Sequence, residues 1–170
     1  MSTSNIRPTP LRVTPKEGTV REHPDNYDAD LLLRLYDLRR EAKLRQAREW
    51  FVREFQAGSL EEHRAQNPPG SERDAFFRMV VGYWDMVGSI VNHGLIKEEF
   101  FFENTGEFWV VWDRIRKWVP AARTTLKNPM MWHNLETLAG KYEAWMEKRA
   151  PEALAALRER LQKSTAKKGS

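Results

Sequence analysis

Apolar positions recur at helical spacing over most of the chain, and they are densest between residues 76 and 118. From Phe76 onward, apolar side chains follow one another through Val80, Tyr83 and Val87 at intervals of three or four residues. This spacing places the side chains on one face of an α-helix. The pattern therefore predicts a core helix at the centre of the fold.

Two glycines lie inside this predicted core helix. Gly82 and Gly88 each lower helix propensity by about 1 kcal/mol relative to alanine, so we expect them to permit the close approach of another helix. The helix is predicted to end at His93, whose ring would face the last carbonyl groups. Gly94 then takes the left-handed position that commonly follows a helix.

Upstream, residues 25–57 are predicted to form one long helix. It carries two offset apolar stripes, so we expect the helix to meet two neighbours in turn or its stripe to wind around it. A charged run lies between the stripes. The pairs Glu41–Arg45 and Glu49–Arg53 have the i,i+4 spacing of helical ion pairs, which predicts a solvated face.

Cap and breaker residues delimit the remaining helices. Ser59 is predicted to cap a short helix, a second short helix is expected over residues 98–103, and Pro120 breaks or bends a later one. Asn128 and Pro129 form a start signal, because asparagine caps and proline suits the first helical position. The chain is therefore predicted to be all-α, an irregular bundle of about six helices.

The composition changes towards both ends of the chain. Residues 1–24 contain four prolines among serine, threonine and arginine, which predicts a disordered proline-rich arm. Residues 25–163 are predicted to be a single helical domain. Residues 164–170, STAKKGS, are predicted to be a frayed basic tail.

Overall composition limits the class of protein. Apolar residues make up 41% of the 170, the mean hydropathy is -0.70, and no cysteine is present. Disulfides, thiolate metal sites and cysteine nucleophiles are thereby excluded. Without an apolar run of about 18 residues or a signal-peptide core, we expect a cytoplasmic protein that does not span a membrane. The net charge of +4 permits acidic partners without requiring them.

Metal, nucleotide and cofactor motifs are not found in the sequence. The four histidines form no HExxH motif and no Glu-x-x-His pair on a core helix, and there is no P-loop or GxGxxG. We therefore predict no metal, no cofactor and no catalytic residue.

Acid–base catalysis is the harder class to exclude, because four carboxylates lie in or beside the aromatic stretch. They are Asp85, Glu103, Glu107 and Asp113. A carboxyl group held against aromatic rings can have a raised pKa. We instead expect these acids on solvated faces or paired with arginines, and the interpretation leans away from an enzyme.

A basic segment supplies the candidate interaction residues. They are Arg114, Arg116, Lys117, Trp118 and Arg123. Arginine beside tryptophan is a combination that can clamp nucleic acid, so a nucleic-acid-associated protein using residues 114–127 is the alternative function. The matching acids in the chain argue against it, because affinity for phosphates depends on uncompensated charge.

A second candidate region is the polar turn after the core helix, where His93, Glu98 and Glu99 lie close together in sequence. If the protein has a site, we expect it where this turn meets the arginine face that begins at Arg114.

Four segments carry a resemblance to a known family. In chain order they read AREWF, YWDMVGSIVNHGLIKEEFFFE, WVVWDRIRKWVPAAR and WHNLETLAGKYEAW. Over about residues 30–148 the chain resembles a family of bacterial helical proteins known only as a domain of unknown function. The resemblance implies a helical fold and supplies no activity or site residue.

Seven tryptophans and eight phenylalanines are many for one small bundle to hide. A surplus aromatic face would be covered by a second subunit or a partner. We therefore predict a non-catalytic scaffold or protein-interaction module that forms a homo-oligomer or binds another protein.

Overall fold

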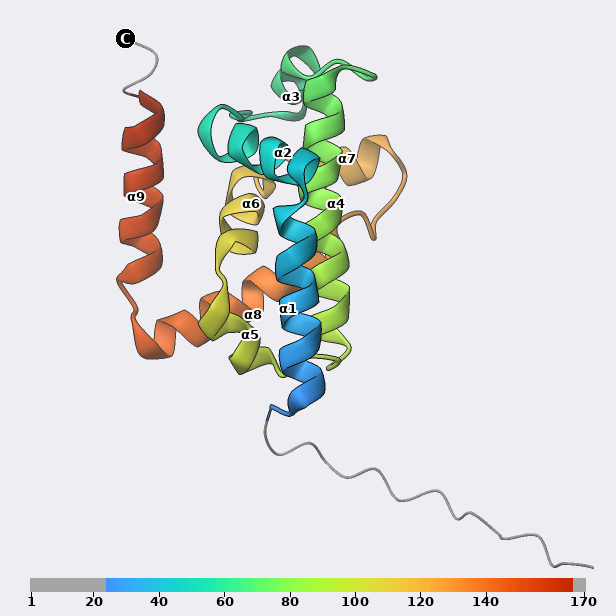
Figure 1. Ribbon diagram of the computed structural model, residues 1–170. Helices are drawn as coiled ribbons and strands as arrows, with labels where there is room; N and C mark the ends of the chain where they lie inside the picture. Colours follow the sequence, from blue (N-terminus) through green and yellow to red (C-terminus); the bar gives the residue numbers. More distant parts are fainter. Residues whose placement is uncertain (1–23, 167–170) are drawn as a thin grey trace, which may run out of the picture.

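The computed structural model describes residues 24–166, and their side chains through residue 163. This part of the chain folds into α-helices without strands (Figure 1). In chain order they are α1 (Asn26–Arg40), α2 (Ala42–Arg53), α3 (Leu60–Gln66), α4 (Glu72–Asn92), α5 (Glu98–Asn104), α6 (Glu107–Ile115), α7 (Val119–Thr125), α8 (His133–Arg149) and α9 (Ala153–Ala166). The all-α class is as predicted, but the described residues form nine helices instead of about six. Residues 1–23 of the predicted arm lie outside the described part.

The predicted long helix over residues 25–57 is two helices, which is a correction to the sequence analysis. The chain leaves helical geometry at Glu41, where φ is -50° and ψ is 138°. The Glu41 carboxylate accepts a hydrogen bond from the backbone N–H of Leu44 at 2.9 Å, so it caps α2. The two offset stripes therefore belong to separate helices with different neighbours, and only the Glu49–Arg53 ion pair forms as predicted, at 2.7 Å.

Among the described helices, α4 and α8 form the most extensive contact. Gly88 lies at their crossing, where an added Cβ would be 2.7 Å from the carbonyl oxygen of Asn134. The predicted close approach is thus confirmed for Gly88. For Gly82 it is wrong, because an added Cβ there would meet no atom within 4 Å.

Helix α8 begins at His133 and not at the Asn128–Pro129 signal. The Asn128 side chain instead accepts a hydrogen bond from the N–H of Met130 at 3.1 Å within a turn. Trp132, with φ of 54°, precedes the helix and offers no side-chain cap. The cap comes from α4, because Asp85 Oδ1 accepts the hydrogen bond of Leu135 N–H at 3.0 Å.

The tryptophan and phenylalanine side chains pack into a single core. Each of the seven tryptophans and eight phenylalanines is buried or half-buried. Trp84, Trp109 and Phe108 have at most 1% of their surface exposed, and Phe51 stacks on Phe55 with ring centroids 4.6 Å apart. The surplus aromatic face expected from composition is therefore not present in the described structure.

His63 on α3 is held among aromatic rings. Its imidazole stacks on Trp118, with ring centroids 4.8 Å apart and planes at 16°, and lies 4.2 Å from the ring of Phe77. Burial disfavours the charged imidazolium and lowers the pKa of His63 below its ordinary value of 6.5. Asp74 opposes this effect in part.

The lowered pKa predicts that the protein loses stability on acidification. The unfolded chain takes up a proton at His63 near pH 6.5, whereas the folded chain does so only at lower pH. The stability that depends on a neutral His63 is therefore fully present above pH 6.5. It is lost as the pH falls from 6.5 through the pKa of His63 in the folded protein. Urea unfolding at a series of pH values checks this, with His63→Gln as the control that should flatten the dependence in that window. An unchanged slope in this variant would contradict the assignment.

Helix α9 stands apart from the other helices along one side of the molecule and is joined to them through the end of α8 (Figure 1). Leu154 and Leu157 pack against the edge of the core. The helix continues through Ala166, so it includes the first three residues of the stretch expected to be frayed.

Candidate functional site

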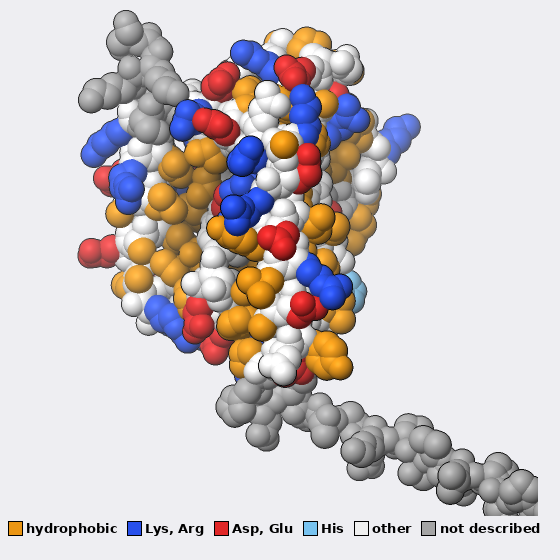
Figure 2. Space-filling view, viewed as in Figure 1, with side chains coloured by type: hydrophobic (Ala, Val, Ile, Leu, Met, Phe, Trp, Pro, Cys, Tyr) orange, Lys and Arg blue, Asp and Glu red, His pale blue; other side chains and the backbone are white. Residues whose placement is uncertain are grey.

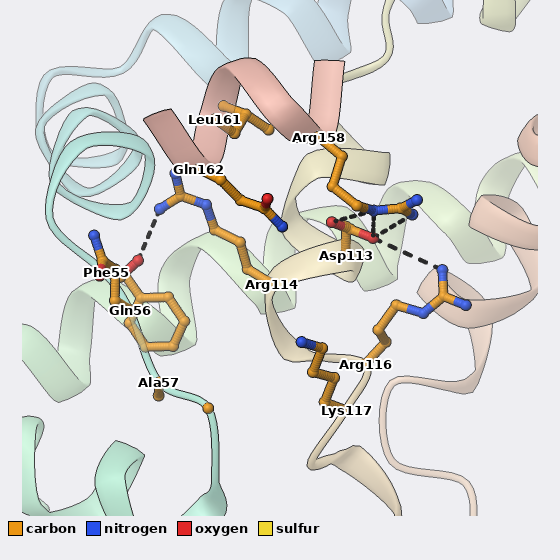
Figure 3. Close-up of a pocket in the computed structure, with 11 residues that line it drawn as sticks. Phe55, Gln56, Ala57, Asp113, Arg114, Arg116, Lys117, Arg158, Leu161 and Gln162 are labelled. Carbon is orange, nitrogen blue, oxygen red and sulfur yellow. Dashed lines mark hydrogen bonds and ion pairs between the residues drawn. The ribbon is translucent and has the colours of Figure 1, made fainter. Parts of the chain in front are cut away.

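A groove lies between α9 and the ends of α2 and α6 (Figure 3). Its volume is about 500 Å³. The described residues that line it are Phe55, Gln56, Ala57, Gly58, Asp113, Arg114, Arg116, Lys117, Arg158, Leu161 and Gln162. Cations outnumber acids in this set, and Phe55, Ala57 and Leu161 supply apolar surface.

The groove continues along the inner side of α9. A second cavity of about 340 Å³ shares Arg116 and Arg158 with the first. The rest of its lining is Glu143, Met146, Glu147, Pro151, Leu154 and Ala155. Hydrophobic side chains gather in the hollow between α9 and the rest of the molecule (Figure 2). The result is an elongated groove with apolar surface, four cations and three acids.

Arg158 ties α9 to α6 across the groove. Its Nε and Nη2 donate to Asp113 Oδ1 at 3.1 and 2.7 Å, and its guanidinium lies 5.1 Å from the ring centroid of Trp109. The hydrogen bond with Asp113 raises the pKa of Arg158. This contact holds α9 against α6.

Two further cations lie at the rim. Arg116 Nη1 is 2.8 Å from Glu143 Oε1 on α8 and 3.8 Å from Asp113 Oδ1. Lys117 is exposed, and within residues 24–163 its ammonium group has no ion-pair or hydrogen-bond partner. Lys117 therefore contributes the least compensated charge of the groove.

Arg114 has a structural role at the floor of the groove. Its Nη1 donates to the carbonyl oxygens of Phe51 and Phe55, each at 2.7 Å, and its Nη2 donates to that of Val52 at 2.8 Å. These carbonyls belong to the last turn of α2 and the residues after it, where helical partners run out. Burial lowers the pKa of the Arg114 guanidinium. The side chain thus caps α2, which the sequence analysis did not anticipate.

Trp118 and Arg123, the other candidate interaction residues, lie outside the groove. Trp118 is 2% exposed, and its indole N–H donates to the carbonyl oxygen of Ala57 at 3.1 Å. Arg123 pairs with Glu136 at 2.7 Å and donates to the Met131 carbonyl oxygen at 3.0 Å. Trp118 thus holds the loop between α2 and α3, and Arg123 joins α7 to α8.

The predicted polar turn is bonded to its own surroundings. His93 Nδ1 donates to the Ser89 carbonyl oxygen at 2.8 Å, as expected for a histidine at a helix end. Glu98 pairs with Lys141 at 2.7 Å and Glu99 with Arg149 at 3.3 Å, both on α8. None of the three turn residues lines the groove, so the structure does not bring the turn and the arginine face together.

Three of the four candidate acids have structural partners. Asp85 caps α8, Glu107 binds Arg48 and Asp113 binds Arg158, while Glu103 is exposed. Over the described part of the chain, no three histidine, aspartate or glutamate side chains lie together in an arrangement that could hold a metal ion.

Sequence reasoning missed Arg158, Leu161 and Gln162. Leu154, Leu157 and Leu161 recur at intervals of three and four residues, which is typical of an amphipathic helix, but this spacing does not indicate which helix α9 would face. The one available signal was Arg158, a cation beside the apolar stripe formed by Leu154, Leu157 and Leu161. Side chains of this kind often cover a neighbouring surface with their methylene groups.

Comparison with known proteins places the fold in a family. Residues 26–142 match the family described as Domain of unknown function (DUF4760). The chain belongs to this family. The family resemblance predicted over residues 30–148 is thereby confirmed, and the match covers α1 to α7 and part of α8 but not α9. One side of the groove therefore comes from the family domain and the other from a helix beyond it.

No curated protein and no solved structure matches the chain. Between residues 24 and 166, no helix has the length and apolar content needed to cross a membrane.

Proposed function

We propose that the protein is a non-catalytic interaction module whose groove between α6 and α9 binds an acidic, partly apolar segment of a partner protein. The observation that carries the proposal is the combination of exposed cations with apolar surface in one elongated hollow. Complementary charge steers association and selects the partner, while buried apolar contact supplies most of the affinity.

The charge of the groove favours an acidic segment. Arg116 and Arg158 share the carboxylates of Asp113 and Glu143, and Lys117 adds a positive charge at the rim. Glu147 also lines the second cavity, so the two cavities together hold four cations and three acids, and the excess is one positive charge. The elongated shape along α9 matches a helix or an extended peptide.

The alternative, nucleic-acid binding through residues 114–127, has weaker support. Arg114 and Arg123 are engaged with carbonyl groups and Glu136, and Trp118 is buried. A single-strand site needs exposed aromatic rings as well as a basic track. The cations of residues 114–127 that are not engaged in this way are few, which favours a protein segment over nucleic acid as the partner.

Self-association is also part of the proposal, and a different surface supports it. Tyr27 and Leu38 on α1 are 76% and 54% exposed. They lie eleven residues apart and so share one helical face. Light scattering during gel filtration tests this part. A monomer at every concentration would remove it without affecting the groove.

Binding of a fluorescein-labelled peptide of glutamate and leucine residues tests the groove. We expect saturable binding measured by fluorescence anisotropy, and roughly fivefold weaker binding to Lys117→Glu, because reversing a rim charge replaces attraction with repulsion. Lys127→Glu is the matched control, since Lys127 is also an exposed loop lysine but lies outside the groove. Its affinity should stay within about twofold of wild type.

Two further measurements sharpen the test. A peptide of lysine and leucine should bind more weakly than the acidic one. Labelled mixed-sequence DNA, measured across a salt series, tests the alternative. Equal affinity of both variants for the acidic peptide, or salt-sensitive DNA binding that exceeds peptide binding, would overturn the proposal.

A further inference from the structure

Apart from the two cavities of the groove, a pocket lies between α1 and the residues at the end of α5. Its volume is about 250 Å³. The described residues that line it are Leu32, Leu33, Leu35, Tyr36, Arg39, Tyr83, Phe101, Asn104 and Thr105. The lining is largely apolar, and Arg39 is its one ionised side chain at neutral pH.

The Arg39 guanidinium is poorly satisfied by the protein. Its side chain is 18% exposed, and its Nε is buried without a hydrogen-bond partner among the described residues. Nη1 lies 3.4 Å from Thr105 Oγ1 and 3.7 Å from Glu107 Oε2, both long for hydrogen bonds of a charged group. Arg39 therefore retains capacity to bind an anion.

The nearest carboxylate is already occupied. Glu107 receives two hydrogen bonds from Arg48, one from Nε at 2.6 Å and a shorter one from Nη2. This bidentate contact raises the pKa of Arg48. One carboxylate thus serves two guanidinium groups, and the pocket end holds an excess positive charge. A poorly compensated, largely buried charge is costly, so an external anion would stabilise it.

The walls beside Arg39 are held in place. Tyr83 donates its hydroxyl to the Leu35 carbonyl oxygen at 2.7 Å, and burial raises the pKa of Tyr83 to about 12. The Tyr36 ring has the guanidinium groups of Arg39 and Arg40 at 5.0 and 5.7 Å from its centroid. The pocket is therefore formed before any ligand arrives, which reduces the entropy cost of binding.

We propose that this pocket binds a small amphiphilic carboxylic acid, with the carboxylate on Arg39 and the apolar body against Leu32, Tyr36 and Phe101. Guanidinium and carboxylate match in geometry and form charge-assisted hydrogen bonds. Pockets for drug-sized ligands start at about 300 Å³, so the occupant is smaller, a medium-length alkyl acid or a single-ring acid. This site goes beyond the proposed partner groove and shares no residue with it.

Isothermal titration with octanoate tests the site on the intact protein. We expect saturable binding, and roughly tenfold or weaker binding of octanamide and octylamine, which keep the alkyl chain but not the negative charge. Arg39→Gln should weaken octanoate binding by roughly tenfold or more. Arg34→Gln, the matched control on the same helix, should change it by no more than about twofold, because the Arg34 side chain is 74% exposed, pairs with Asp30 and does not line the pocket.

Two more variants keep the outcome decisive. Leu33→Trp places a bulkier group at the mouth, at a residue that is 63% exposed, and should weaken binding without unfolding the protein. Lys117→Glu in the groove should leave octanoate binding unchanged, so the two sites succeed or fail separately. The absence of saturable octanoate binding to the wild-type protein, or equal binding of octanamide, would overturn the proposal even if Arg39→Gln failed to fold.

Discussion

Replacing Gly88 with alanine is expected to lower the free energy of unfolding by about 3 kcal/mol. The added Cβ would lie 2.7 Å from the carbonyl oxygen of Asn134 and 2.8 Å from its carbonyl carbon. Backbone atoms of a packed helix cannot move aside as a flexible side chain can, so α4 and α8 must separate. Because this is the most extensive helix contact in the described structure, the core loosens with them. Urea unfolding followed by far-ultraviolet circular dichroism measures the loss.

Gly82 is the matched control on the same helix. Gly82 is exposed, and its added Cβ would meet no atom within 4 Å. Gly82→Ala should therefore raise the free energy of unfolding by up to about 1 kcal/mol through helix propensity alone. If both substitutions stabilised the protein, α8 would not approach α4 as closely as the structure shows.

Replacing Arg114 with glutamine is expected to destabilise the fold by about 3 kcal/mol. The guanidinium donates to three carbonyl oxygens at the end of α2, and a hydrogen bond to a charged group makes a net contribution of about 1.5–3 kcal/mol. The shorter amide reaches fewer of these carbonyls. Equilibrium unfolding in urea measures the loss, and Arg114→Lys should fall between wild type and Arg114→Gln, because lysine keeps the charge but not the planar fork.

Arg116→Gln is the comparison that separates capping from charge. Arg116 carries the same charge two residues away, but its side chain is 41% exposed and its partner is Glu143 at the surface. Exposed ion pairs contribute at most about 1 kcal/mol, so this variant should lose less than that. Equal losses at both positions would show that charge, and not the capping of α2, explains the effect of Arg114.

The role of Arg114 links stability to the groove. The residues that follow α2, including Ala57, form one wall of the groove, and Arg114 holds the chain at the point where that wall begins. Its charge is directed into the protein, whereas Lys117 points its charge to solvent. The basic segment seen in the sequence is thus divided between a structural cation and cations free to meet a partner.

Much of the fold could be predicted because it depends on local contacts. Ser59 and Ser71 cap α3 and α4 through bonds three residues along the chain, and Gly94 adopts φ of 71° as its position predicts. Such interactions depend on neighbours in sequence alone. The helical class and the core character of α4 could be predicted from the spacing of apolar residues, and the family resemblance from the sequence segments themselves.

The start of α8 was misplaced because it depends on a distant residue, Asp85 of α4. The break between α1 and α2 is local, since Glu41 accepts the hydrogen bond of Leu44 N–H, but the helix-favouring residues on both sides of Glu41 do not indicate it. A cap supplied by another helix leaves no pattern in the segment that it caps. Asn128–Pro129 is a valid local start signal, but the packing of α8 against α4 places the start of the helix at His133.

The candidate sites divide in the same way. Arg114, Arg116 and Lys117 lie together because they are near neighbours on one turn of chain, and the sequence alone determined that grouping. Whether each charge faces inward or outward, and that Arg158 would join them, was decided by the docking of α9 on α6. Likewise, Arg39 became an under-satisfied cation only because Arg48 holds Glu107. Local spacing sets which residues share a helix face, whereas competition for a buried partner is resolved only by tertiary contacts.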